Sequence, residues 1–117
     1  MPTKKLSKAE LVALLKNGCV AEFNKDRPKG EINLTRVNLF GVNLTEFNLD
    51  DANFTFANLT RVIFGDNLTN IKFIFAELDG SNIFEVDTLS CTGVPVGPKK
   101  SILDNSPENW KEISNVY

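Results

Sequence analysis

The sequence predicts an all-β solenoid, a rod in which short extended segments alternate with turns, with helical segments at its ends. Two observations lead to this prediction. A large apolar residue returns every five residues between about positions 32 and 90, and a second recurring position lies two residues before each of them. Spacings of two and then three fit neither a continuous helix nor a continuous strand. A short extended piece followed by a turn, repeated along the chain, satisfies both.

The two recurring positions form parallel series with asparagine between them in most units. The first series is Leu34, Leu39, Leu44, Leu49, Phe54, Leu59, Phe64, Leu68, Phe73, Leu78 and Ile83. The second is Ile32, Val37, Val42, Phe47, Ala52, Ala57, Val62, Asp66, Ile71, Ala76, Ser81 and Val86. We expect both series to face inward and to form the core.

A helix is predicted over residues 6–17, before the repeats begin. Ser7 is placed as its N-cap and Glu10 stands three residues later, the pair that forms a capping box. Gly18 is suited to the left-handed residue that ends a helix.

A second helical turn, at about residues 20–24, is expected to carry Phe23 toward the rod. The segment 27–30 (Arg-Pro-Lys-Gly) then breaks the helix and leads into the repeats. We interpret residues 1–30 as an N-terminal helical cap, because a solenoid must cover the apolar end of its first coil. A helix that binds a partner is the alternative.

Residues 52–56 (Ala-Asn-Phe-Thr-Phe) and 57–61 (Ala-Asn-Leu-Thr-Arg) resemble the pentapeptide-repeat family, whose consensus is Ala-Asp/Asn-Leu-X-X. The resemblance covers about half of the chain, residues 31–90. It implies a right-handed quadrilateral β-helix with four repeats in each coil. The twelve units then make about three coils, stacked at a strand spacing of about 4.8 Å. The inward columns would be Leu34, Phe54 and Phe73; Leu39, Leu59 and Leu78; Leu44, Phe64 and Ile83; and Leu49, Leu68 and Thr88.

The period is interrupted once, between Phe64 and Leu68, where one residue is missing. Asp66 then takes an inward position that is apolar in most other units. Two arrangements are open: a tightened corner in which Asp66 bonds loop amides, or a shift of register that turns Leu68 outward. We expect the first, because the period resumes at once and a buried, unpaired carboxylate would be costly.

Outward positions are where contacts with other molecules can form. The candidate partner surface is apolar and consists of Phe40, Phe56, Ile74, Phe75 and Phe84, with Phe56 expected beside Phe75 of the next coil. Contiguous exposed apolar patches usually mark contacts. The occupant is the chain's own tail with its segment 94–96, a second copy in a dimer, or a separate protein partner.

Residues 91–117 are predicted to be a linker and a C-terminal tail. A helix start is expected at Ser106, which would place Trp110, Ile113 and Tyr117 on one face. This face could close the last coil or dock a second molecule. The resemblance implies homodimers that form through the C-terminal end of the rod.

Charge is unevenly distributed along the chain. Residues 1–30 carry seven Lys/Arg against three Asp/Glu, whereas residues 31–90 carry three against nine. Either the rod is acidic with a charge-complementary cap, or its surface resembles nucleic acid. Some members of the family mimic DNA and modulate type II topoisomerases such as gyrase, which the acidic rod would suit. The candidate acidic surface is Asp50, Asp51, Glu77 and Asp79. We do not expect direct nucleic-acid binding.

No catalytic constellation is recognisable. The sequence has no histidine, and neither Cys19 nor Cys91 has an evident base beside it in the sequence. We therefore expect no enzyme activity, no cofactor and no metal. No secretory signal or apolar run of about 18 residues is present, so we expect a cytoplasmic protein without a membrane span. The predicted function is a non-catalytic protein–protein interaction module, and the alternative is a DNA-mimicking modulator of gyrase.

Overall fold

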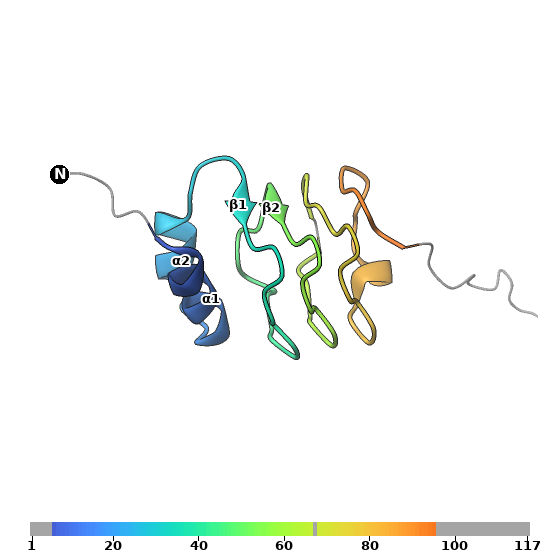
Figure 1. The fold of residues 1–117 in the computed structure, drawn as a ribbon, viewed down its shortest axis with the longest axis horizontal. Helices are drawn as coiled ribbons and strands as arrows, with labels where there is room; N and C mark the ends of the chain where they lie inside the picture. The colour runs from blue at the N-terminus through green and yellow to red at the C-terminus, as the bar shows by residue number, and fades with distance from the viewer. Residues whose placement is uncertain (1–5, 67, 96–117) are drawn as a thin grey trace, which may run out of the picture.

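The computed structural model describes residues 6–66 and 68–95 of the protein. Along the chain lie helices α1 (Lys8–Lys16) and α2 (Val20–Asp26), strands β1 (Ile32–Asn33) and β2 (Ala52–Asn53), and the short 3-10 helix η1 (Ile83–Glu85). Figure 1 shows both α-helices at one end and successive loops of chain stacked beside them. The predicted tail helix, with its candidate contacts Trp110, Ile113 and Tyr117, and Val96 of the predicted cover lie outside the described residues.

Helix α1 begins and ends as its sequence predicts. The Ser7 hydroxyl accepts the Glu10 N–H at 3.1 Å, and the Glu10 carboxylate accepts the Ser7 N–H at 2.8 Å. These two bonds satisfy free amides of the first turn. At the other end Gly18 has a φ of 71°, and the Cys19 N–H bonds to the Leu14 carbonyl at 2.9 Å. This is a Schellman motif, so the first predicted helix is confirmed at both ends.

Helix α2 attaches the helical segment to the repeats and extends two residues beyond its predicted end. Phe23 is fully buried, and its ring meets the Phe47 ring edge-on, with centroids 5.3 Å apart. Just after the helix, the Arg27 guanidinium donates to the carbonyls of Asn48 (2.7 Å) and Asp50 (2.9 Å). An aromatic contact and charge-assisted hydrogen bonds therefore help to hold the helices against the first coil, together with Leu11 and Leu15, which belong to the same core.

The repeats wind so that the chain meets itself about every 20 residues. Strands β1 and β2 pair in parallel, with Ile32 opposite Ala52. Single parallel bridges continue the pairing from Asn38 to Asn58 and, after the four-residue step, from Asn58 to Glu77. We number the coils by their residues: 32–51, 52–70 and 71–90. The arrangement is β-helix-like, and its strands are only two residues long because the chain turns in nearly every unit.

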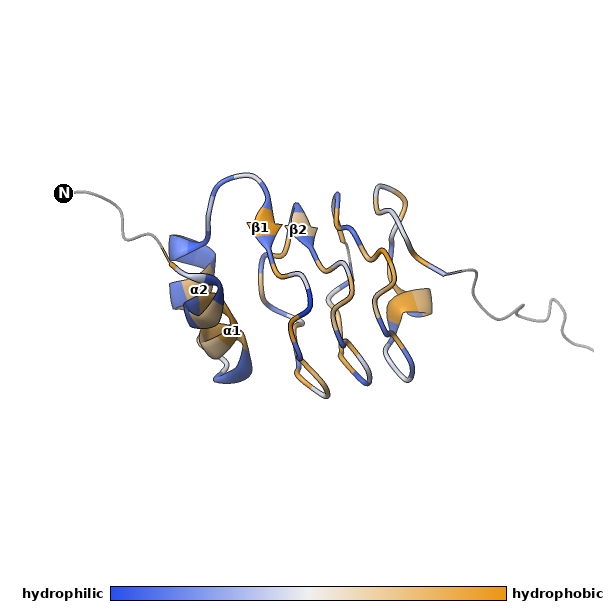
Figure 2. Ribbon diagram, in the orientation of Figure 1, coloured by the Kyte–Doolittle hydropathy of each residue, from blue (hydrophilic) through white to orange (hydrophobic). Residues whose placement is uncertain are grey.

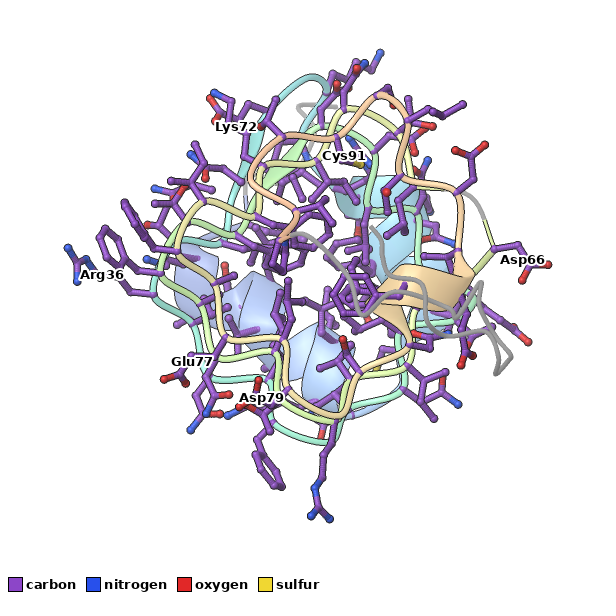
Figure 3. The ribbon with its side chains drawn as sticks, turned by 90° about the vertical axis from the view of Figure 1, so that its right-hand side faces the viewer. Arg36, Asp66, Lys72, Glu77, Asp79 and Cys91 are labelled. Carbon is purple, nitrogen blue, oxygen red and sulfur yellow. The ribbon has the colours of Figure 1, made fainter. Side chains whose placement is uncertain are left out.

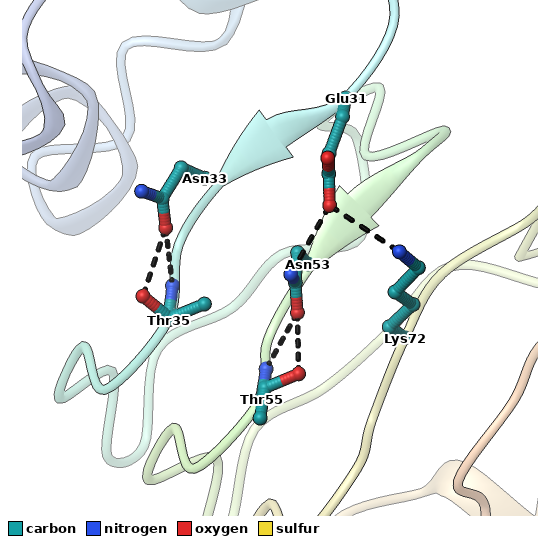
Figure 4. A network of polar contacts seen from close by, with 6 residues as sticks. All are labelled: Glu31, Asn33, Thr35, Asn53, Thr55 and Lys72. Carbon is teal, nitrogen blue, oxygen red and sulfur yellow. Dashed lines mark hydrogen bonds and ion pairs between the residues drawn. The ribbon is translucent and has the colours of Figure 1, made fainter.

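The recurring asparagines hold the turns in shape, a role that the sequence analysis did not assign. The Asn33 side-chain oxygen accepts the Thr35 N–H at 3.1 Å and the Thr35 hydroxyl at 2.8 Å (Figure 4). The same backbone bond, from the residue two positions later, is made by Asn38, Asn43, Asn48, Asn53 and Asn58. Such Asx-turns compete with continuous strand pairing and favour a turn. Asparagine thus ends each short extended piece.

The inward series is confirmed as the core. Every member of the large apolar series is buried, while Thr88 of the last predicted column is only half-buried. The Phe73 ring stacks on Phe54 (6.0 Å between centroids) and meets Phe64 edge-on (5.6 Å). Figure 2 shows hydrophobic and hydrophilic residues alternating along each coil. The second series is less deeply buried: Val42 near its start is half-buried, as are Ala76, Ser81 and Val86 toward its end.

At the four-residue step one part of the prediction is wrong. Leu68 is buried, as expected, but the Asp66 side chain is exposed instead of inward. Its backbone carbonyl accepts the Asp87 N–H at 2.8 Å, so the contact with the next coil continues. The outward position of Asp66 avoids the cost of removing a carboxylate from water. A tighter corner accommodates the unit that is one residue shorter.

Gly65 makes this tighter corner possible. A Cβ atom on it would lie 2.6 Å from the Thr45 carbonyl oxygen of the coil below. We expect Gly65→Ala to destabilise the fold by about 1–3 kcal/mol, because the obstructing atom belongs to the backbone. The exposed neighbour provides the control: Asp66→Ala should change stability by less than about 0.5 kcal/mol. Urea unfolding followed by circular dichroism measures both, and equal stabilities would contradict the close approach.

Candidate functional site

Large apolar side chains remain exposed along the repeats. Within the described residues they are Phe40, Phe56, Ile63, Ile74, Phe75, Phe84 and Leu89. All five side chains of the candidate partner surface are in this set. Ile63 and Leu89 were not singled out from the sequence, although both occupy outward positions of the repeat.

Two of the phenylalanines form a stack with an arginine, which we call the Phe ladder: Arg36, Phe56 and Phe75. The Phe56 and Phe75 rings are stacked, with centroids 5.3 Å apart and an interplanar angle of 21°. The Arg36 guanidinium carbon lies 4.6 Å from the Phe56 centroid, within cation–π distance. The expected neighbours Phe56 and Phe75 are confirmed. Arg36 was missed, although its position 20 residues before Phe56 signals the same column.

The Phe ladder lies at corners where the backbone is left-handed, as it also is at Asp51, Arg61 and Asn70. Arg36, Phe56 and Phe75 have φ angles of 62°, 61° and 55°. Each is the third residue of a tight turn; the Ala57 N–H, for example, bonds to the Phe54 carbonyl at 2.9 Å. Positive φ at this place favours Gly or Asn and is uncommon for a bulky aromatic residue. The turn therefore does not account for phenylalanine at either position.

The Phe ladder borders a surface that we call the Phe flank, formed by outward side chains of residues 36–40, 56–60 and 75–79. Parallel contacts place the three segments in register, with Asn38 beside Asn58 and Asn58 beside Glu77. The rows are Arg36, Asn38 and Phe40; Phe56, Asn58 and Thr60; and Phe75, Glu77 and Asp79. Figure 3 shows Arg36, Glu77 and Asp79 along one side of the molecule, and Asp66 on the opposite side.

Charge is therefore separated along the Phe flank. Its first row carries the cation Arg36, its middle row is uncharged, and its third row carries the carboxylates of Glu77 and Asp79. Apart from the cation–π contact of Arg36, these three side chains make no hydrogen bond or ion pair with the other residues that the structure describes.

Comparison with known proteins shows which kind of chain carries this surface. A family model described as pentapeptide repeats matches residues 32–66, with eight copies. Residues 32–66 belong to the pentapeptide-repeat family. The match contains the first two rows of the Phe flank, while the third row lies beyond it. Comparison of this pentapeptide-repeat protein with curated proteins and with solved structures found no match.

The candidate acidic surface of the pentapeptide-repeat protein is divided between two parts of the rod. Glu77 and Asp79 lie on the Phe flank, whereas Asp50 and Asp51 lie at the corner that precedes β2. Elsewhere, the Glu31 carboxylate contacts the Asn53 amide at 3.1 Å and the Lys72 ammonium at 3.6 Å (Figure 4). That ion pair is half-exposed and adds little stability. The four candidate carboxylates do not form one continuous patch.

At the far end of the pentapeptide-repeat protein, a cleft of about 530 Å³ is lined in part by Phe84, Leu78 and Pro95. Val94 is half-buried and packs on the core. Of the segment expected to cover the exposed rings, Val94 thus packs on the core and Pro95 lines this end cleft. Phe56 and Phe75 nevertheless remain 49% and 74% exposed. Val94 and Pro95 therefore leave the Phe ladder uncovered, and Val96, the last residue of the expected cover, lies outside the described residues.

The two cysteines of the pentapeptide-repeat protein are half-buried and form no disulfide. Burial raises the pKa of the Cys91 thiol, which also donates to the Leu68 carbonyl at 3.4 Å. A raised pKa lowers the thiolate fraction and with it the reactivity. In residues 6–66 and 68–95, no group of three or more metal-ligating side chains is present, and no helix is long and apolar enough to span a membrane.

Proposed function

We propose that this protein is a non-catalytic protein–protein interaction module, and that its residues 31–90 form a right-handed, four-sided solenoid of about three coils. Backbone contacts about 20 residues apart, combined with inward residues every five, support four sides. The observation that carries the functional proposal is the Phe ladder. It is an exposed aromatic stack that the fold does not need.

The Phe ladder has a conformational cost that a partner could offset. A non-glycine residue in the left-handed region costs roughly 1–2 kcal/mol. Residues held in such conformations cluster at sites of function. Burying a phenylalanine that is now exposed would contribute about 1.5–3 kcal/mol to binding. Phe56 is 49% exposed and Phe75 74% exposed, so about half of this gain is still available at Phe56 and about three quarters at Phe75.

A stacked solenoid suits this role because its backbone is held by contacts between coils. The Phe56 N–H bonds to the Ile74 carbonyl at 2.9 Å, directly behind the two stacked rings. Rigid presentation lowers the entropy lost when a partner binds. The absence of histidine from the sequence also supports a non-catalytic role.

DNA mimicry for a type II topoisomerase such as gyrase stays the second hypothesis. The separation of Asp50 and Asp51 from Glu77 and Asp79 argues against it, since a DNA mimic needs a continuous line of charge. The homodimer through the C-terminal end and the cytoplasmic location also stay predictions.

The test of the proposed function separates stability from recognition. Phe56→Asn and Phe75→Asn, made together, should leave the melting temperature within a few degrees of the parent, because asparagine tolerates positive φ. The same double variant, used as bait, should lose proteins that the parent retains. Phe84→Asn, on another side of the rod, is the matched control and should keep them. A large loss of stability in the double variant, or identical retained proteins, would contradict the proposal.

A further inference from the structure

We propose that the Phe flank binds the Phe flank of a second copy of this chain, in an antiparallel two-fold dimer. The inference rests on the proposed function, because it names the partner of that same surface. Its starting point is the separation of charge: Arg36 lies at one end of the Phe flank, and Glu77 and Asp79 lie at the other.

When the two rods lie side by side with their axes aligned, two-fold symmetry leaves two ways to place such surfaces face to face. In a closed dimer the same patch serves both copies, so that if one residue contacts a second, the second also contacts the first. With the axis along the rod, each row faces the same row of the other copy in reverse order, so that Phe75 faces Asp79. With the axis along the middle row, the rods run antiparallel and the first row meets the third. Phe56 then meets its own counterpart, and Arg36 meets the row that begins with Phe75.

The antiparallel arrangement pairs Arg36 with Glu77, two of the three charges that are unpaired in one copy, while Asp79 faces Phe40. Arg36 comes beside Glu77 of the second copy, and symmetry makes this contact twice. The Arg36 guanidinium already lies over Phe56, but its N–H groups have no hydrogen-bond partner among the described residues. A guanidinium can contact an aromatic face and bond a carboxylate at the same time. The opposite orientation leaves Arg36 facing Phe40 and lacks this complementarity.

The aromatic stack points to the same arrangement. Phe56 has Arg36 near its ring and Phe75 stacked on it, so both of its neighbours along the rod are present. Phe75 ends the stack and is the most exposed of the phenylalanines, at 74%. The antiparallel copy brings a second Arg36 to this ring. Each ladder therefore gains the cation that its last ring lacks.

The size of the Phe flank predicts a weak dimer. Three rows at about 4.8 Å and five-residue segments make a surface roughly 15 Å on each side. This buries a few hundred Å² per copy, below the ~800 Å² of a standard stable interface. We expect a dissociation constant of the order of tens to hundreds of micromolar, and weakening with added salt.

The experiment is sedimentation equilibrium of the full chain between about 10 µM and 1 mM, a range set by the expected affinity. The average mass should rise toward the dimer. Arg36→Glu and Glu77→Arg should each raise the dissociation constant at least about tenfold, because each places like charges together. An equimolar mixture of these two variants should form a heterodimer tighter than either homodimer. In that mixture both contacts join opposite charges.

Lys29→Glu is the matched control. Lys29 is also an exposed cation, but it lies between α2 and β1, outside the Phe flank. Its reversal should change the dissociation constant by less than about threefold, since exposed charges outside such pairs interact weakly. A dimer that survives both single reversals, or a mixture no tighter than its components, would overturn the inference. A parent monomer up to 1 mM would also overturn it, while the proposed function keeps its own test.

Discussion

Leu59→Asp is expected to unfold the repeat region. Leu59 is fully buried, in the inward column that also contains Leu39 and Leu78. The change removes a buried side chain, which costs about 2–5 kcal/mol, and adds a carboxylate without a partner, which costs several more. The total free energy of unfolding of a domain of this size is about 5–15 kcal/mol. Coils support one another along the axis, so the loss should spread through the stack.

Far-UV circular dichroism and thermal unfolding measure this effect. The variant should lack a cooperative transition, whereas Thr60→Asp should keep one near the parent's temperature. Thr60 is the next residue and its side chain points outward, half-buried on the Phe flank. A native-like spectrum and melting curve for Leu59→Asp would show that this column is not part of the core.

Phe73→Ala is expected to cause the second large loss of stability, lowering the free energy of unfolding by about 3–5 kcal/mol. Phe73 is fully buried and its ring contacts Phe54 and Phe64. Removing it leaves a cavity between two coils where two aromatic contacts were made. For a domain of this size such a loss lowers the melting temperature by more than about 10 °C.

Phe75→Ala is the matched comparison, two residues along the same segment. Phe75 points outward and is 74% exposed, so its removal should cost less than about 1 kcal/mol. Phe75→Asn should be neutral or stabilising, because it relieves the positive φ. Urea unfolding of the three variants gives the differences directly. Similar losses for Phe73→Ala and Phe75→Ala would mean that the outward ring is structural and would remove the main support for a partner surface.

Local spacing by itself determined most of the fold. The return of a large apolar residue every five positions predicts which side chains are buried. An extended piece followed by a turn points these side chains inward, independently of the register with the neighbouring coil. The capping box of Ser7 and Glu10 likewise depends only on neighbours three residues apart. The stacking of Phe56 on Phe75 follows from the same period once four repeats make a coil.

Three features needed the tertiary structure, because each depends on the register between coils. Asp66 points outward because the tightened corner allows its carboxylate to stay exposed to solvent. Arg36 shares the column of Phe56 by its spacing, but only the stacked coils show that its guanidinium lies over the Phe56 ring. Glu77 and Asp79 lie apart from Asp50 and Asp51 because they are on different sides of the coils. A count of charges along the sequence does not show this separation. The sequence alone determined which residues face inward, through local alternation. Stacking between coils decided which outward side chains meet, and hence where the candidate site lies.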